Sequence, residues 1–234
     1  PSVRRLREMD RTVKLTIDAR LTVRAAEILR RRLRAANKER GAVVVLDPAS
    51  GAVLAIVNAP TPLNVILGTQ DPVAEGEYFD RARFGLYPPG SVFKLVTAAA
   101  ALRMDPQVVN VGYGCRRLPN RRVGAVVRGW TVRDDITDKE PHGSISLSAA
   151  LARSCNAYFA QLAVEKVGAQ RLFETAKMLG IRVGNPDTPE RLERFLLQAS
   201  YGQGEVLVSP LQVARLAAAV ANGGNIPNIH FVTG

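Results

Sequence analysis

Hydrophobic and polar positions in the first quarter of the chain predict a strand, a helix and a hairpin. Polar and apolar side chains alternate along residues 12–17, and many of them favour β-structure, which is typical of a strand. Asp18 is a good helix cap, and apolar positions recur after it at helical spacing as far as about Ala36. Two apolar runs at 41–46 and 53–57 flank a turn, which predicts an antiparallel hairpin. This order of elements indicates an α+β fold rather than a parallel sheet.

After the hairpin the pattern changes to a long polar loop and then to helices. Residues 58–85 contain several prolines and glycines, and loops of this length are often functional. The apolar, alanine-rich run at 95–102 predicts a buried helix, and residues 108–132 predict short strands and turns. Helical spacing returns from about residue 147, and the last predicted helix, 211–221, follows a Ser-Pro start signal.

Composition and charge narrow the class of protein. The chain has 234 residues, 47% of them hydrophobic, which is enough for one large globular domain or two small ones. The sequence contains no run of 18 apolar residues, so we expect no membrane span within it, while an export signal or anchor upstream stays open. The net charge is +11, and residues 1–40 hold 13 Lys and Arg against 5 Asp and Glu.

This basic stretch has the charge to meet nucleic acid or anionic lipid. However, its arginines at 30–34 lie opposite an apolar helix face, and no aromatic side chain is interleaved with them. A solvated helix face is therefore the favoured interpretation, and we predict no nucleic-acid partner.

Cysteine and histidine are scarce. Cys115 and Cys155 are too few for a disulfide framework or a zinc motif, so they form either one bridge in an exported protein or two buried thiols. His142 and His230 lie far apart in the sequence, without metal-ligand spacing. The sequence thus predicts neither a metal centre nor a cofactor.

Candidate chemistry lies at residues 87–94, Tyr-Pro-Pro-Gly-Ser-Val-Phe-Lys. Two prolines and a glycine predict a tight turn, which places Ser91 at the N-terminus of the alanine-rich helix. Lys94 follows three residues later and so lies on the same helix face. A lysine whose pKa is lowered by burial can accept the proton that a nucleophilic serine must lose. The alternative is a capping serine followed by a solvated lysine, which this motif alone favours.

A second motif, Ser154-Cys-Asn156, lies at a break between predicted helices. A second hydroxyl near a nucleophile can relay a proton to a leaving group, and an Asn amide can contact both a lysine and a substrate amide. A pair of helix-capping side chains is the alternative, and it is favoured when the motif is taken by itself. Taken together with Ser91 and Lys94, the pair favours catalysis.

At this point the residues resemble a family, the penicillin-binding transpeptidases, and the Pro-Pro-Gly before Ser91 resembles their class B, monofunctional branch. That resemblance implies a β-lactamase/transpeptidase-like α+β fold, with a central antiparallel sheet flanked by helices and an all-helical lobe that carries the second motif. Further stretches are also similar to the family, namely residues 15–21, 41–48, 51–55, 86–98, 154–159 and 201–212.

The resemblance implies a role for each motif residue. Ser91 would be the acylated nucleophile, Lys94 its general base and Ser154 the proton relay, while Asn156 would hold the lysine and the substrate amide. The implied reaction joins peptidoglycan stem peptides through an acyl-enzyme at Ser91, with release of D-alanine, and β-lactams would acylate the same serine. No cofactor is implied.

One departure concerns the family's third motif, Lys-Thr-Gly, because the chain ends in Val232-Thr-Gly. We therefore expect residues 12–234 to be a transpeptidase domain that is incomplete at its C-terminal end, preceded by the tail of another region at 1–11. The resemblance also implies a membrane anchor upstream, a membrane glycosyltransferase partner, and a place in the bacterial cell envelope at the outer face of the cytoplasmic membrane.

Two other functions stay open on the sequence. A β-lactamase or D,D-carboxypeptidase would resolve the acyl-enzyme with water, although no carboxylate motif for water activation is evident. A non-catalytic penicillin-binding scaffold or sensor would explain the departure at Val232, but it would not explain why the nucleophile and its base are both present.

Overall fold

The computed structural model describes residues 12–61 and 76–233 of the chain. The described residues belong to two compact units, one built from residues up to 84 together with those from 217 onward, the other from residues 85–216. The predicted tail at 1–11 lies outside the described residues, as does much of the predicted long loop.

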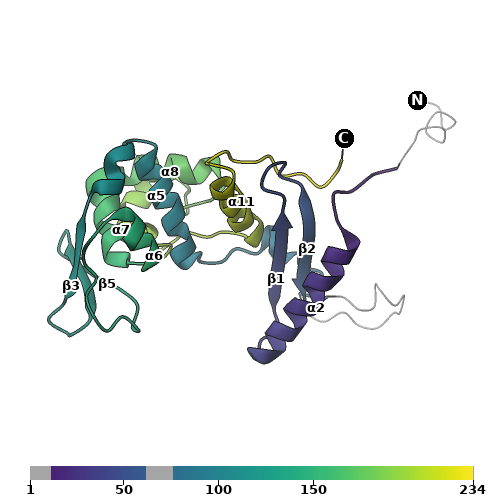
Figure 1. Ribbon diagram of the computed structural model, residues 1–234, viewed down its shortest axis with the longest axis horizontal. Coiled ribbons are helices and arrows are strands. Elements are labelled where there is room, and N and C mark those ends of the chain that lie inside the picture. The colour runs from purple at the N-terminus through teal and green to yellow at the C-terminus, as the bar shows by residue number, and fades with distance from the viewer. Residues whose placement is uncertain (1–11, 62–75, 234) are drawn as a thin grey trace. The chain divides into compact units, whose positions relative to one another are not determined.

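The first unit contains the predicted helix and hairpin (Figure 1). Helix α2 (Ala19–Ala35) is capped by Asp18, whose carboxylate accepts a hydrogen bond from the Leu21 amide at 2.9 Å. Strands β1 (Gly41–Leu46) and β2 (Val53–Ala59) pair antiparallel, and α2 packs against them. Alternate residues of β2 are buried, as a strand with one covered face requires. The short helix α4 (Arg81–Phe84) completes the described part of this unit before residue 85.

The strand predicted at 12–17 is wrong. This segment makes only an isolated bridge between Leu15 and Val232, framed by backbone hydrogen bonds from Thr16 to Phe231 and from Thr233 to Lys14, both 2.9 Å long. The Asp18 amide then donates to the Leu54 carbonyl at 2.8 Å, where the chain passes from this bridge into α2.

The second unit is mostly helical. The segment that carries Ser91 begins as a 3₁₀ turn, η1 (Gly90–Phe93), which continues into α5 (Lys94–Leu102). The remaining helical elements are η2 (Pro106–Asn110), α6 (Leu147–Ala152), α7 (Asn156–Leu162), the π-helical η3 (Ala163–Val167), α8 (Gly168–Met178), α9 (Pro189–Glu193), α10 (Leu196–Ala199) and α11 (Pro210–Ala221), which begins in this unit.

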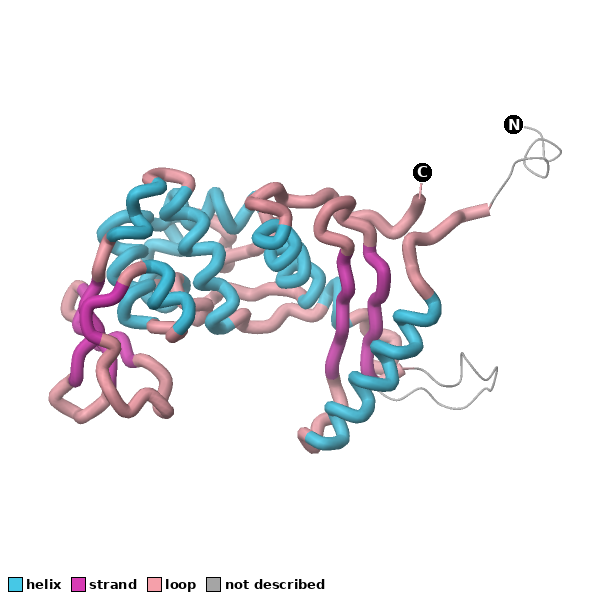
Figure 2. The backbone as a smooth tube through the Cα atoms, viewed as in Figure 1, coloured by secondary structure: helices cyan, strands magenta, loops and turns pink. Residues whose placement is uncertain are grey.

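This lobe is not all-helical, because the strands predicted within 108–132 form part of a sheet. Four short strands, drawn in magenta in Figure 2, pair antiparallel in the order β5-β4-β3-β6. Their bounds are β3 (Tyr113–Arg117), β4 (Val123–Val127), β5 (Trp130–Arg133) and β6 (Gly143–Ile145). The fold is thus mixed α+β, as the sequence predicted.

Helix α7 links the sheet to α5 in the core of this unit. Tyr158 and Phe159 on α7 are fully buried, and the ring of Tyr158 meets Tyr113 of β3 edge-on at 5.2 Å between centroids. The Tyr158 hydroxyl donates to the Val111 carbonyl at 3.0 Å, which satisfies its polar end. The N-terminal end of α7, where the second motif lies, is therefore fixed against both the sheet and the helices.

Candidate active site

The turn before Ser91 is held by a second segment that is distant in sequence. Tyr87 and Val208 exchange two backbone hydrogen bonds of 2.9 Å, and the Gly90 amide donates to the Gly202 carbonyl at 3.0 Å. Gly202 has a φ of +81°, and a Cβ there would lie 1.9 Å from the Gly90 carbonyl oxygen. Glycine is therefore required at this close approach, which explains part of the stretch at 201–212 that the sequence singled out.

Ser91 and Lys94 face one another across a single turn. Lys94 Nζ donates to Ser91 Oγ at 2.9 Å, to Ser154 Oγ at 2.9 Å and to the Ser154 carbonyl at 2.5 Å. These contacts use all three protons of an ammonium group. Ser154 Oγ also donates to Ser91 Oγ at 2.8 Å, so the three side chains form a closed triangle. We call Ser91, Lys94 and Ser154 the nucleophile cluster.

Burial sets the protonation of this cluster. Lys94 is only 1% exposed, whereas Ser91 and Ser154 are exposed. Loss of water around the amine lowers the pKa of Lys94 to about 8, although the nearby Asp134 carboxylate opposes the shift. A lysine with a pKa this close to neutrality can act as a general base, which an ordinary solvated lysine cannot.

The backbone of Ser154 is strained. Ser154 has a φ of +54°, in the left-handed region that a residue with a Cβ rarely adopts. This conformation lets the chain turn between the end of α6 and the start of α7 and brings Ser154 Oγ to both partners. Such strain is common at functional sites and costs on the order of 1–3 kcal/mol.

Asn156 lies beside the cluster but is held differently from the prediction. Its Nδ2 donates to the Arg133 carbonyl at 2.9 Å, and among the described residues the structure records no hydrogen bond from Asn156 to Lys94. The group that holds the lysine is instead the carbonyl of Ser154. The structure thus brings three of the four predicted residues into direct contact and ties the fourth to the end of β5.

Comparison with known proteins shows the family of this chain. Residues 41–234 match the family model described as the penicillin binding protein transpeptidase domain. The chain belongs to this family. It is 30% identical to the peptidoglycan D,D-transpeptidase PbpA of Mycolicibacterium smegmatis over 207 residues, which cover 79% of this chain and 41% of that protein. It is also 28% identical to the peptidoglycan D,D-transpeptidase MrdA of Haemophilus influenzae over 258 residues, covering 95% and 36%.

Solved structures agree with the sequence relatives. The penicillin G acyl-enzyme complex of penicillin-binding protein A from M. tuberculosis matches with a TM-score of 0.75 at 27% identity, covering 94% of this chain and 54% of that one. Pseudomonas aeruginosa PBP2 in complex with WCK 5153 matches with a TM-score of 0.69 at 27% identity, covering 95% and 54%. The predicted resemblance to class B transpeptidases and their fold is confirmed. The chain spans about two fifths of the length of the two curated relatives.

The penicillin-binding domain contains a second group of polar side chains, which the sequence did not predict. Cys115, Asp134, His142 and Cys155 each offer one ligand atom, and these atoms all lie within 4.8 Å of one another. We call them the thiol cluster. The sequence predicted no metal centre from the spacing of these residues, and sequence spacing does not reveal that they lie close together in space. The four residues come from β3, the end of β5, the segment before β6 and the cap of α7.

Asp134 is the centre of the thiol cluster. Its Oδ2 accepts from Cys115 Sγ at 3.0 Å and from Cys155 Sγ at 3.3 Å, while its Oδ1 accepts from the Ala157 amide at 3.0 Å. Burial raises the pKa of Cys115 to about 11 and raises that of Cys155 well above its usual range, so both thiols are protonated without a cation. Two sulfurs, an imidazole nitrogen and a carboxylate oxygen are a donor set that suits Zn²⁺.

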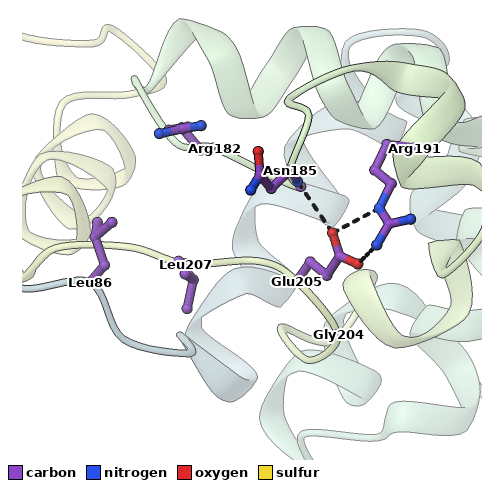
Figure 3. Close-up of a pocket in the computed structure, with 8 residues that line it drawn as sticks. Leu86, Arg182, Asn185, Arg191, Gly204, Glu205 and Leu207 are labelled. Carbon is purple, nitrogen blue, oxygen red and sulfur yellow. Dashed lines mark hydrogen bonds and ion pairs between the residues drawn. The ribbon is translucent and has the colours of Figure 1, made fainter.

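A separate cavity is lined by none of the residues of the nucleophile cluster (Figure 3). Its volume is about 480 Å³, and its lining includes Arg182, Asn185, Arg191, Glu205 and Leu207. Glu205 accepts hydrogen bonds from the Asn185 amide at 3.2 Å and from Arg191 Nε at 2.9 Å, and it contacts Arg191 Nη2 as well. These hydrogen bonds, that from Arg191 first, lower the pKa of Glu205. The ion pair between Arg191 and Glu205 ties α9 to the segment just before Val208.

Proposed function

We propose that this chain is part of a peptidoglycan D,D-transpeptidase and carries the residues that form the acyl-enzyme, with Ser91 as the nucleophile. The observation that carries the proposal is the closed triangle of contacts among Ser91, Lys94 and Ser154, at 2.8–2.9 Å between side-chain atoms. Membership of the transpeptidase family and the names of the relatives support it. Because the chain spans only part of those relatives, activity, substrate and partners are proposals for the protein as a whole.

In the proposed acylation, neutral Lys94 takes the proton from Ser91 Oγ as this oxygen attacks the carbonyl between two terminal D-alanines of a stem peptide. The backbone N–H of Ser91 donates to the developing oxyanion, a contact of a kind worth roughly 3–4 kcal/mol in the transition state. Ser154 Oγ passes a proton from the lysine to the departing amine, because it lies within hydrogen-bond reach of both Lys94 and Ser91. D-alanine then leaves.

In the second half-reaction, the amine of a neighbouring peptide attacks the acyl carbon and Ser91 Oγ is restored. Asn156 is assigned to substrate orientation. Its Nδ2 is used by the Arg133 carbonyl, which leaves Oδ1 to accept a hydrogen bond from an amide N–H of the substrate. This assignment keeps the contact with the substrate amide that the resemblance implied and leaves out the contact with Lys94.

The alternative in which water resolves the acyl-enzyme needs a carboxylate that can activate that water. Asp134 approaches the second motif, but its side chain is fully buried and its oxygens already accept from two thiols and an amide. This arrangement favours a persistent acyl-enzyme over β-lactamase turnover. The scaffold alternative is disfavoured by the lowered pKa of Lys94, since a non-catalytic domain has no need for a poised amine.

The proposed setting is the bacterial cell envelope, at the outer face of the cytoplasmic membrane, where stem peptides and a membrane glycosyltransferase partner would be available. Among the described residues, no helix is both long and apolar enough to cross a membrane. The proposed ligands are stem peptides and β-lactams, and no nucleic acid is proposed.

The direct test is to incubate the full-length protein with a labelled penicillin and to map the adduct by mass spectrometry of peptides. We expect a stable adduct on Ser91 that forms in the native protein and not after denaturation. Rapid hydrolysis of the penicillin without a lasting adduct would favour the β-lactamase alternative. Absence of any adduct on Ser91, with no hydrolysis, would refute the proposal.

A further inference from the structure

The thiol cluster contains a buried polar atom without a partner. His142 Nδ1 is buried and makes no hydrogen bond among the described residues, and the imidazole side chain is only 6% exposed. The nearest acidic atom, Asp134 Oδ2, lies 3.7 Å away, which is too long for a hydrogen bond. A buried nitrogen without a partner needs an explanation, and this one lies near two thiols and a carboxylate. A ligand bound by all four residues would provide it.

Three distances within the cluster are close to those around a tetrahedral metal ion. Bonds of about 2.0–2.3 Å to a tetrahedral Zn²⁺ put its ligand atoms roughly 3.3–3.8 Å apart. From Asp134 Oδ2 the two sulfurs lie at 3.0 and 3.3 Å and the His142 nitrogen at 3.7 Å, so small shifts would admit an ion. On its other side, His142 Nε2 lies 3.7 Å from Asp138 Oδ1, so a short movement would let this carboxylate accept the hydrogen bond that orients a metal-binding imidazole.

The cluster is also distinctive in holding two thiols. Two thiolates side by side can be joined by oxidation to a disulfide, which no longer binds a metal as the thiolates do. Cys115 Sγ and Cys155 Sγ both contact the same carboxylate oxygen and lie within 4.8 Å of each other. Since a disulfide bond is about 2.05 Å long, the sulfurs must approach by roughly 3 Å at most.

We propose that Cys115, Asp134, His142 and Cys155 hold one divalent ion of the zinc class, and that a peroxide releases this ion by joining Cys115 and Cys155 in a disulfide. Two thiolates together give two electrons to hydrogen peroxide. The O–O bond breaks, two hydroxide ions form, the S–S bond forms, and the metal leaves with its charge unchanged. The site then holds either an ion or a disulfide, never both.

Because Cys155 adjoins Ser154, both the ion-bound state and the disulfide state would affect the nucleophile cluster. Cys155 lies between Ser154 and Asn156, and Asp134 also anchors the Ala157 amide at the start of α7. With the ion bound, four ligands from separate elements fix this segment. Formation of the disulfide draws Cys155 toward β3 and so displaces the adjoining Ser154. Metal binding itself does not depend on the proposed transpeptidase activity and is tested separately.

The experiment uses the full-length protein, loaded with Zn²⁺ under reducing conditions and freed of excess metal and reductant. Elemental analysis should give one zinc per chain. Addition of hydrogen peroxide should release that zinc to a chromogenic chelator, in step with loss of both thiols and a mass lower by two hydrogen atoms. Peptide mapping should then find the bond between Cys115 and Cys155.

Two variants separate metal binding from oxidation. Cys115→Asp keeps an oxygen ligand in place of the sulfur, so it should retain zinc but form no disulfide with peroxide. His142→Phe removes the nitrogen ligand and should lower zinc affinity at least about tenfold. The control is His230→Ala, which removes the chain's other histidine and should leave the zinc content unchanged.

A loaded, folded protein that holds no stoichiometric zinc would overturn the proposal. It would also be overturned if peroxide left both thiols intact, or if a disulfide formed while the zinc stayed bound. Circular dichroism of each variant separates loss of the site from loss of the fold.

Discussion

The nucleophile cluster and the thiol cluster are joined by one peptide bond, between Ser154 and Cys155, yet they differ in almost every physical respect. The hydroxyls of Ser91 and Ser154 are exposed to solvent, and only the amine of Lys94 is buried. In the thiol cluster the two cysteines and Asp134 are at most 3% exposed. The first cluster is accessible to a substrate. The second is closed to a peptide substrate, which suits a group that stabilises the second motif by packing beneath it.

The largest effect is expected from removal of the proposed nucleophile, which should separate the roles of the two clusters most clearly. Ser91→Ala should abolish penicillin acylation, because no other exposed hydroxyl of the cluster lies one helical turn from the lysine. The free energy of unfolding should change by less than about 0.5 kcal/mol, since the side chain is exposed. Gel detection of a fluorescent penicillin and denaturant unfolding measure the two effects. Retained acylation in this variant would show that another residue is the nucleophile.

The next largest effect is expected at Lys94. Lys94→Met keeps most of the side-chain volume and removes the base, so acylation should slow about 10²–10⁴-fold. Folding should tolerate the change, because burial disfavours the charged amine in the native state. A lowered pKa in the folded protein means that the wild type gains stability as pH rises from about 8 toward the pKa of the unfolded state. The Met variant should lack this gain, as thermal unfolding at several pH values would reveal.

Ser154 offers a matched pair of variants. Ser154→Ala and Ser154→Gly both delete the relay hydroxyl, so both should slow acylation by similar factors of about 10²-fold. They should differ in stability, since glycine adopts the φ of +54° freely and alanine does not; the Gly variant should be more stable by about 1 kcal/mol. Equal stabilities would argue against strain at this position, and unchanged acylation would argue against the relay.

The smallest effect on acylation is expected from the buried side of the comparison. Asp134→Asn replaces a carboxylate oxygen by an amide nitrogen that cannot accept from the thiols, and should lower the free energy of unfolding by about 2 kcal/mol. Acylation should fall less than tenfold, because Asp134 does not touch Ser91. Stopped-flow acylation with penicillin and urea unfolding measure both. If acylation fell more than tenfold while the variant stayed folded, Asp134 would belong to the catalytic machinery.

The two clusters also show what the sequence could predict. Ser91 and Lys94 lie on one helical turn, so their contact follows from local geometry, and the hairpin and α2 follow from periodicity. The proximity of Ser154, 63 residues away, was inferred from its residue type taken with Ser91 and Lys94 and from the resemblance, because no spacing rule predicts it. The tie of Asn156 to Arg133 was missed, because it depends on where β5 ends.

The thiol cluster could not be predicted, for a physical reason. Its residues come from four separate elements, and Asp134 carries no signal of its own in the sequence. Strand pairing of β3 with β6 and the docking of α7 are what bring Cys115 and Cys155 together. The one available hint was a cysteine within the second motif, Ser154-Cys-Asn156, and it gains meaning only when its neighbours in space are known.

The central claim is that a buried, poised Lys94 activates Ser91, and the dependence of acylation on pH tests it most directly. The rate of penicillin acylation should rise with pH and level off above an apparent pKa of about 8, as the amine loses its proton. Peptide mapping across the series should place the adduct on Ser91 at every pH. A rate that stays constant from about pH 6 to pH 10 in the native protein would contradict the account.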